Sequence, residues 1–333
     1  MLKPFLAASM MALAAPAAWA ACATDAEIAA FVESYTAKTP AQALSPGGSM
    51  EDSLCTQSKL AAALEPHMGV VIGYKAGLTS KPAQERFGAA EPVRGLLFQN
   101  MMLQDGATLD APWGAIPMVE ADLVLVVADA GINNATTPEE ALVHISAIRP
   151  FIELPDLTLA KGQPLTAETI TAMGVGTRLG VLGAPVMVDD PAEMARMLEG
   201  MSVTLRDAGG GVLVQAPGRA VLGHPVNAAL WLRSKGVVFK AGDLISVGSF
   251  GPLFPPRAGK GGVSVTYEGL PGNPVVQVHF REKAGMGCGR CFASGAARSD
   301  PRRAIGAALD PTRAGSCREP SMGGRTSLAG PGR

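Results

Sequence analysis

"MVEADLVLVV", residues 118–127, reads as a buried β-strand that carries two carboxylates one residue apart, Glu120 and Asp122. Side chains alternate between the two faces of a strand, so these two acids share one face. Two neighbouring anions beside an apolar run repel each other and lose hydration, so at neutral pH they need protons, hydrogen-bond donors or a cation. The stretch therefore indicates a site for a divalent metal. An exposed edge strand is the alternative.

A third carboxylate of the same kind follows in "RPFIELPDL", residues 149–157, where Glu153 interrupts another apolar segment. Glu120, Asp122 and Glu153 would form an oxygen-only ligand set. Such a set suits Mg²⁺ or Mn²⁺ and leaves coordination positions open to substrate oxygens. In the alternative interpretation, Glu153 simply faces water.

The composition predicts a globular protein. The chain has 333 residues, of which 47% are hydrophobic and 17% charged, enough for a full-sized core in one or two domains. Residues 1–20 contain Lys3, an apolar run and then Ala18-Trp19-Ala20, the pattern of a signal peptide cleaved before Ala21. We therefore expect a periplasmic or secreted protein that is not membrane-bound after cleavage. A retained anchor helix is the alternative.

The cysteines fall into two groups. Export would place Cys22 and Cys55 in an oxidising compartment, where they could pair. The region from Arg281 onward has ten basic and four acidic residues and one aromatic residue, which predicts a disordered basic tail over 282–333. Cys288-Gly-Arg-Cys291 in that tail is a weak metal signal without a second pair. Export and the lack of stacking aromatic residues argue against a nucleic-acid partner.

The hydrophobic patterns predict helices first and strands later, and therefore a strand-rich α+β fold with a mixed or antiparallel sheet. Two helices open the chain, one capped by Thr24 or Asp25 and one by the capping pair Ser49 and Asp52. We expect helices over 25–37, 50–64, 137–147, 190–199 and 224–234. Strands are expected over 69–78, 119–127, 243–249 and 274–280, in "MSVTLRD" and "GVLVQ" around residue 210, and in "GVSVTYEG".

Six ordered blocks between residues 45 and 280 carry a family resemblance. They are "GYKAGLTS" (73–80), "RGLLFQNM" (94–101), "VEADLVLVV" (119–127), "IRPFIELPD" (148–156), "GRAVLGHPVNAALWL" (218–232) and "AGDLISVGSFGP" (241–252). The chain resembles the fumarylacetoacetate hydrolase superfamily, and within it the branch of 2-keto-4-pentenoate hydratases and 4-oxalocrotonate decarboxylases. The resemblance implies a mixed β-sheet roll over residues 69–281, preceded by a helical region over 21–68. We also expect a homo-oligomer.

The resemblance also implies roles for individual residues. The metal pair of the family falls on Glu120 and Asp122, and its third ligand on Glu153. Asp122 departs from the family by being one methylene shorter than the usual Glu. The lysine of the first block falls on Lys75, for which a surface position is the alternative. We expect burial and the metal to lower the pKa of Lys75, so that it moves protons to and from a metal-stabilised enolate of a 2-oxo acid.

Further residues of these blocks are candidates for substrate binding: Ser80, Arg94, His224, Asn227 and Ser249. A helix that begins near His224 could hold a substrate carboxylate on its free backbone N–H groups, although His224 could equally cap the helix. After Glu153 the chain lacks the Trp-Lys and Ala-Asp-Asn segments usual in the family, which favours a hydratase over a decarboxylase. An acylpyruvate hydrolase and a noncatalytic binding protein remain alternatives.

Overall fold

The strand with the two acids, β5 (Glu120–Val127), lies in the middle of an eight-stranded mixed sheet. The computed structural model describes residues 22–281; the expected signal peptide and basic tail fall outside that range. In spatial order the sheet contains β2 (Val93–Phe98), β1 (Val71–Gly77), β11 (Leu244–Ser246), β5, β6 (Ile145–Leu154), β7 (Leu179–Leu182) and β3 (Met102–Gln104), and β8 (Val186–Met187) also pairs with β6.

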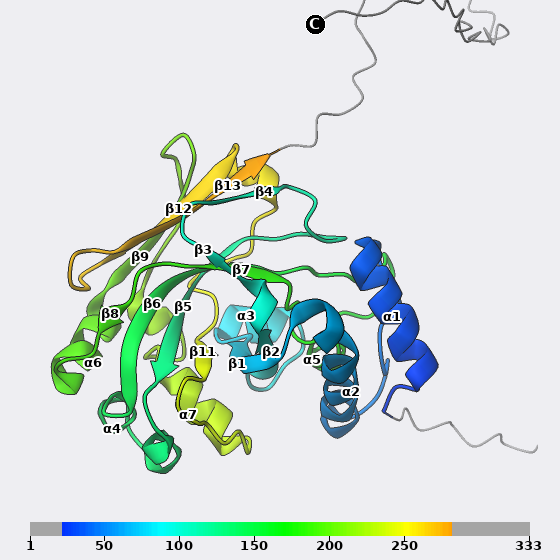
Figure 1. Ribbon diagram of the computed structural model, residues 1–333, viewed down its shortest axis with the longest axis horizontal. Coiled ribbons are helices and arrows are strands. Elements are labelled where there is room, and N and C mark those ends of the chain that lie inside the picture. The colour runs from blue at the N-terminus through cyan, green and yellow to red at the C-terminus, as the bar shows by residue number, and fades with distance from the viewer. Residues whose placement is uncertain (1–21, 282–333) are drawn as a thin grey trace, which may run out of the picture. The chain divides into compact units, whose positions relative to one another are not determined.

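A second, five-stranded sheet packs beside the first, as Figure 1 shows. Its order is β10 (Val212–Pro217), β9 (Ser202–Asp207), β12 (Gly262–Glu268), β13 (Val275–Arg281) and β4 (Ala107–Asp110). β13 alternates strictly between exposed and buried residues, as a half-buried strand should. The inner face of this sheet and part of the eight-stranded sheet share one hydrophobic core. The expected strand-rich α+β fold is thus confirmed.

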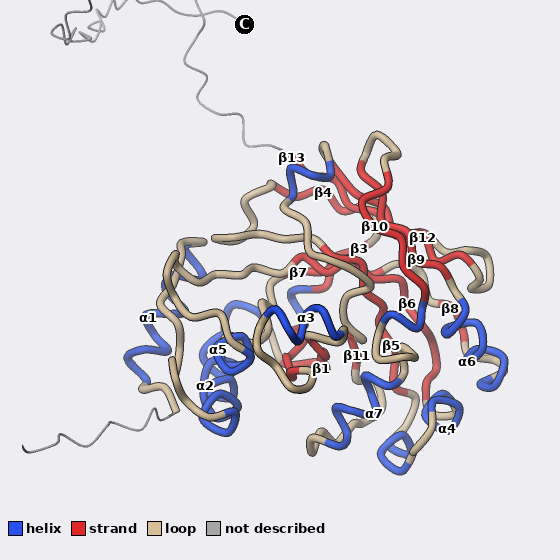
Figure 2. The backbone as a smooth tube through the Cα atoms, turned by 180° about the vertical axis from the view of Figure 1, so that it is seen from behind, coloured by secondary structure: helices blue, strands red, loops and turns tan. Residues whose placement is uncertain are grey.

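The helices form two groups on either side of the eight-stranded sheet, which can be followed in Figures 1 and 2. One group consists of α1 (Asp25–Ala37), α2 (Met50–Met68) and α5 (Ala167–Ala172), which share a second hydrophobic core. In this group α2 and α5 pack on β2, and α1 packs on α2. The other consists of α4 (Pro138–Leu142), α6 (Pro191–Gly200) and α7 (Asn227–Ser234). A short helix, α3 (Lys81–Arg86), follows β1.

The two N-terminal helices begin where the sequence predicts. Thr24 caps α1 and Ser49 caps α2, each in a reciprocal capping box with the acid three residues later. Cys22 and Cys55 form a disulfide, so the predicted pairing is confirmed and the start of α1 is tied to α2.

The helix predicted over residues 137–147 is wrong in its second half. α4 ends at Leu142, and the chain enters β6 at Ile145. Nearly every residue of β6 is buried or half-buried, so its apolar positions show no period of two that would distinguish a strand from a buried helix. Pairing with β5 along the whole strand decides the outcome, and Pro150 would in any case break a helix.

Candidate active site

The three predicted carboxylates converge on one face of the eight-stranded sheet. Glu120 on β5 lies directly opposite Glu153 on β6 in the antiparallel ladder, and Asp122 follows two residues later on the same face of β5. One carboxylate oxygen from each of the three lies within 4.8 Å of the others. Asp122 and Glu153 are fully buried, and Glu120 is 7% exposed. Both alternatives are therefore ruled out, because β5 is not an edge strand and Glu153 does not face water.

Lys75 reaches the same cluster from β1. Its side chain is buried, and its ammonium group forms an ion pair with Glu153. Nζ also donates a hydrogen bond to the carbonyl oxygen of Val175 at 3.1 Å. Gly95, the partner of Lys75 on β2, leaves the room for this side chain, because a Cβ at Gly95 would lie 2.6 Å from Lys75 Cγ. The surface alternative for Lys75 is therefore ruled out.

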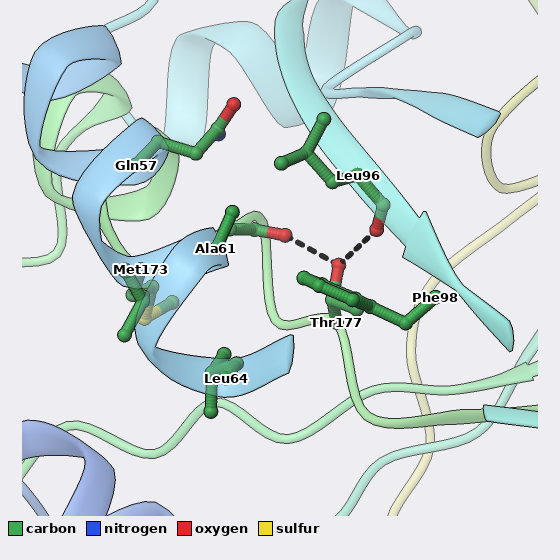
Figure 3. A pocket seen from close by; sticks show the side chains of 9 residues that line it. Gln57, Ala61, Leu64, Leu96, Phe98, Met173 and Thr177 are labelled. Carbon is green, nitrogen blue, oxygen red and sulfur yellow. Dashed lines mark hydrogen bonds between the residues drawn. The ribbon is translucent and has the colours of Figure 1, made fainter. Parts of the chain in front are cut away.

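The Val175 carbonyl is presented by an unusual stretch of backbone. Gly174, Val175 and Gly176 have φ values of 78°, 59° and 69°, a conformation that a β-branched residue rarely adopts. The hydroxyl of Thr177 anchors the stretch, since Oγ1 lies 2.8 Å from the carbonyl oxygen of Leu96 and 2.6 Å from that of Gly174 (Figure 3). Thr177 thus holds in place the backbone stretch that presents the Val175 carbonyl to Lys75.

Figure 3 also shows a small cavity behind this stretch, between α2 and β2. Its volume is about 10 Å³, which is at most the space of one water molecule. Gln57, Phe98 and Met173 are among its lining residues. The cavity is therefore too small to be the substrate site.

Asp122 is held by three hydrogen-bond donors. Its Oδ1 accepts from the backbone N–H groups of Leu123 at 2.6 Å and Gly248 at 2.9 Å, and its Oδ2 accepts from the hydroxyl of Ser246. The backbone carbonyl of Asp122 also accepts a hydrogen bond from the hydroxyl of Tyr267, on β12 of the other sheet. Strands of both sheets thus position this one residue.

The metal-free cluster favours protonated carboxyl groups. Burial, together with the charge of Glu153, raises the pKa of Asp122 to about 7, and the same two causes raise the pKa of Glu120 well above its usual value. Burial by itself lowers the pKa of Lys75, but the negative charges of Glu153, Glu120 and Asp122 outweigh it, and the net shift is upward. In the metal-free protein the pKa of Lys75 is therefore raised. The expected lowering, which includes the effect of the bound metal, stays a prediction for the metal-bound protein.

The donor set fits a hard divalent cation. All three candidate ligands are carboxylates, which Mg²⁺ and Mn²⁺ prefer. Oε2 of Glu153 is buried and has no hydrogen-bond partner in the described chain, a state that is costly unless something compensates for it. A cation shared by the three carboxylates would compensate for it and would replace the protons that the raised pKa values imply.

Two of the predicted substrate-binding residues lie near Lys75 in the fold, Ser80 after β1 and Arg94 on β2. Ser80 is the residue before α3, and its side chain makes no capping hydrogen bond. Arg94 pairs with Ala76, one position away from the pair of Lys75 and Gly95. Because successive residues point to opposite faces, Arg94 lies on the face opposite to the one that carries the carboxylates.

The other three predicted substrate-binding residues make local hydrogen bonds. Both ring nitrogens of His224 are engaged by the backbone, Nε2 with the Ala195 carbonyl at 3.0 Å and Nδ1 with the Val226 N–H at 3.1 Å. Asn227 donates to the Leu222 carbonyl at 2.9 Å. The hydroxyl of Ser249 donates to the Gly251 carbonyl at 2.7 Å. These bonds fix the local backbone and do not join the residues to the carboxylate cluster.

Three contributors to the cluster escaped sequence reasoning. Ser246, three residues before the predicted Ser249, is the serine that contacts a carboxylate. Its signal is a hydroxyl inside the buried strand "DLISV" (243–247), at a place where an apolar residue is expected. The Val175 carbonyl carried no such signal, apart from the glycines on both sides of it. Gly95 could have been found only by knowing that it pairs with a buried lysine.

Comparison with known proteins gave relatives at about 30% identity and solved structures with the same fold. The chain is 30% identical over 197 residues to 2-hydroxyhexa-2,4-dienoate hydratase of Comamonas testosteroni, covering 57% of this chain and 72% of the relative. It is 30% identical over 208 residues to 2-keto-4-pentenoate hydratase 2 of Dechloromonas aromatica, covering 60% of this chain and 75% of the relative. No protein-family model matches the chain.

One of the matching solved structures is 4-oxalocrotonate decarboxylase from Pseudomonas putida G7, complexed with magnesium and adipate. It superposes with a TM-score of 0.65 at 20% identity, over 77% of this chain and 96% of the other. At this identity the match establishes the fold. The mixed β-sheet roll expected for residues 69–281 is therefore the fold of the described chain.

Proposed function

The chain belongs to the fumarylacetoacetate hydrolase superfamily, in the branch of the 2-keto-4-pentenoate hydratases, and from this premise we propose that it is a metal-dependent hydro-lyase for a small 2-oxo or 2-hydroxy-dienoic acid. Water would add across a carbon–carbon double bond conjugated to the 2-oxo group, with the hydroxyl joining one carbon and a proton the other. Its hydratase relatives, which are about 30% identical, support this reaction class.

One observation carries the proposal: the buried cluster of Glu120, Asp122 and Glu153 with Lys75 against it. Apolar residues would stabilise the core without the desolvation cost of burying three acids and a lysine. We propose Mg²⁺ or Mn²⁺ as the cation. When bound, it would neutralise the negative charge that develops on the 2-oxygen of the substrate as the enolate forms.

The protein's own groups would admit the substrate and transfer the proton. Glu120 is the one member of the carboxylate trio that retains exposure, so the substrate would approach from its side. Lys75 would deliver a proton to the enolate carbon and take it back in the reverse direction, as a general acid and base. The Val175 carbonyl would hold its ammonium group in place, because that hydrogen bond does not involve a cation ligand.

The metal site is tested by Glu120→Gln, compared with Glu268→Gln, a change of the exposed acid at the end of β12. Mn²⁺ should raise the melting temperature of the parent and of Glu268→Gln. It should fail to raise that of Glu120→Gln, because a charged ligand has been lost from a small oxygen site. Equal melting shifts in all three proteins would rule out the metal site.

The reaction is tested on a panel of 2-oxo acids in Mg²⁺. Uptake of water by a 2-hydroxy-dienoic acid supports the hydro-lyase, whereas cleavage of an acylpyruvate would identify the hydrolase of the same fold. Metal binding without turnover of any compound would leave the noncatalytic binding protein.

We also propose that the protein works outside the cytoplasm. The disulfide between Cys22 and Cys55 supports this location, because such bonds persist in oxidising compartments. Within the described range, none of the helices has the length and apolarity of a membrane span. N-terminal sequencing of the protein recovered from the periplasm or medium tests this location. We expect the recovered chain to start at Ala21.

A further inference from the structure

Asp122 differs from the other two carboxylates in what holds it. Glu153 is paired with the charged Lys75, and its second oxygen is without a hydrogen bond among the described residues. Asp122 instead accepts from three uncharged donors, of which only the hydroxyl of Ser246 is a side chain. This difference assigns a specific task to Ser246.

The position of Ser246 follows from the sheet register. Ser246 is the last residue of β11 and pairs with Val124 on β5 and with Lys75 on β1. Asp122 is two residues from Val124, so it is the diagonal neighbour of Ser246 on the same face. Ser246 thus lies between the lysine and the aspartate and is fully buried.

The backbone after Ser246 supplies the second contact. Gly248 has a φ of 99°, and a Cβ there would lie 2.6 Å from Thr79 Oγ1 and 2.7 Å from the Ala76 carbonyl oxygen. Only glycine lets the chain pass this close to β1 and direct its N–H at Asp122. The chain beyond β11 is therefore shaped around the Asp122 carboxylate.

Counting acceptor positions shows the consequence. An ionised carboxylate has about four acceptor positions, and three donors reach the Asp122 carboxylate. One position remains for a cation. Asp122 would therefore bind with a single oxygen in one fixed orientation, whereas a carboxylate without these donors could rotate.

We propose that Ser246 is a positioning residue that orients Asp122 as a metal ligand. This inference rests on the metal site of the proposed function. The hydroxyl fixes the short Asp122 side chain from the β11 side. A glutamate at position 122 would then collide with Ser246 and the Gly248 backbone.

The first test is Mn²⁺ affinity by titration calorimetry on the full chain. Ser246→Ala should weaken Mn²⁺ binding about 10- to 100-fold, the usual effect of removing a group that hydrogen-bonds to a ligand. The matched control is Ser146→Ala on β6, which removes a hydroxyl that donates to the Val126 carbonyl in the same sheet; its affinity should equal that of the parent. Unchanged affinity in Ser246→Ala would overturn the inference.

The second test exchanges length between the two positions. Asp122→Glu should bind Mn²⁺ more weakly than the parent, because the added methylene has no space in a fully buried site. The double variant Asp122→Glu with Ser246→Ala should bind more tightly than Asp122→Glu alone. A double variant whose loss is the sum of the two single losses would overturn the inference, since independent sites add.

Two further results keep these tests decisive. If Ser246→Ala does not fold, Ser246→Cys, which replaces the hydroxyl with a weaker donor, should bind Mn²⁺ more weakly than the parent, and parental affinity would overturn the inference. If the parent binds no Mn²⁺, the proposed function fails together with the inference. If the parent and Ser146→Ala bind while Ser246→Ala binds equally well, only the inference fails.

Discussion

The two sheets of this protein treat buried charge in opposite ways. In the eight-stranded sheet, Asp122 is fully buried in the middle of the core and its pKa is raised to about 7. In the five-stranded sheet, Asp207 lies at the end of β9, accepts backbone hydrogen bonds from Gly209 and Gly211 and pairs with Lys260 at 2.7 Å. Its pKa is lowered, first by the hydrogen bond from Lys260. The surroundings of Asp122 disfavour its ionised form, whereas those of Asp207 favour its ionised form.

This difference separates a functional site from a structural one. A buried aspartate that accepts backbone hydrogen bonds and pairs with an exposed lysine stabilises the fold at neutral pH without further help. A cluster of three buried carboxylates does not, and it persists in a protein when a ligand or a reaction requires it. Substitutions in the two sheets should therefore have different consequences for activity and for stability.

The largest expected effect is on turnover. Lys75→Met keeps most of the side-chain volume and removes the charge and the donors, so we expect kcat to fall by about 10²- to 10⁴-fold, the range for general acid–base groups. Mn²⁺ binding should survive. Lys260→Met, which removes the cation that pairs with Asp207, should retain parental kcat. Steady-state kinetics in saturating Mg²⁺ makes the comparison.

The kinetic pattern of Lys75→Met distinguishes two roles. A proton-transfer group acts in the transition state and mainly lowers kcat, whereas a group that only holds the substrate raises KM. A variant with parental kcat and a raised KM would contradict the assignment of Lys75 as the acid and base.

The next effect concerns stability and uses one leucine from each sheet. Leu205 on β9 and Leu125 on β5 are both fully buried, and truncation to alanine should lower the free energy of unfolding by about 2–5 kcal/mol in each case. Leu125→Ala should also weaken Mn²⁺ binding, because β5 carries two of the carboxylates. Leu205→Ala should bind Mn²⁺ as the parent does.

Denaturant titration and calorimetry measure these two quantities separately. Parental Mn²⁺ affinity in both leucine variants would mean that the carboxylates are positioned independently of the packing beneath β5. A parallel loss of affinity in Leu205→Ala would mean that the sheets are coupled, and the hydroxyl of Tyr267 on the Asp122 carbonyl is the contact through which the coupling would act.

The sequence predicted the cluster because buried charge is visible as an interruption of an apolar pattern. Glu120, Asp122 and Glu153 each stand inside a run of apolar residues, and the capping box of Ser49 and Asp52 is equally local. The family resemblance added Lys75, which no local pattern marks as buried. Patterns of this kind need only the spacing of residues along one segment.

What the sequence could not give depends on pairing between distant segments. The end of α4 and the start of β6 were decided by pairing with β5. The placement of Arg94 on the face opposite to the carboxylates follows from a register in which Lys75 faces Gly95. Ser246 was passed over for Ser249 because only the ladder with β5 shows which serine is the neighbour of Asp122. None of these registers can be read from a single strand.

The smallest expected effect is on the pH dependence of stability, and it tests the comparison of the two aspartates directly. In the metal-free protein the folded-state pKa of Asp122 is about 7, against an ordinary value of 3.8. The folded state therefore holds a proton that the unfolded state has released, and the free energy of unfolding should fall as the pH rises between these two values. For Asp207 the folded-state pKa is lowered, so its contribution is present at neutral pH and is lost as the pH falls through that lowered value.

The matched variants are Asp122→Asn and Asp207→Asn, melted in a metal chelator at about pH 5 and about pH 8, on either side of the pKa of Asp122. Asp122→Asn should gain stability over the parent at the higher pH, because it removes a buried charge, and this gain should shrink at the lower pH, where the parent carboxyl is protonated. Asp207→Asn should lose stability at both values, since both lie above the pKa of Asp207 and the pair with Lys260 is broken. If Asp122→Asn melted below the parent at the higher pH, Asp122 would be stabilised as an anion by its three donors alone, and the contrast between the two sheets would not hold.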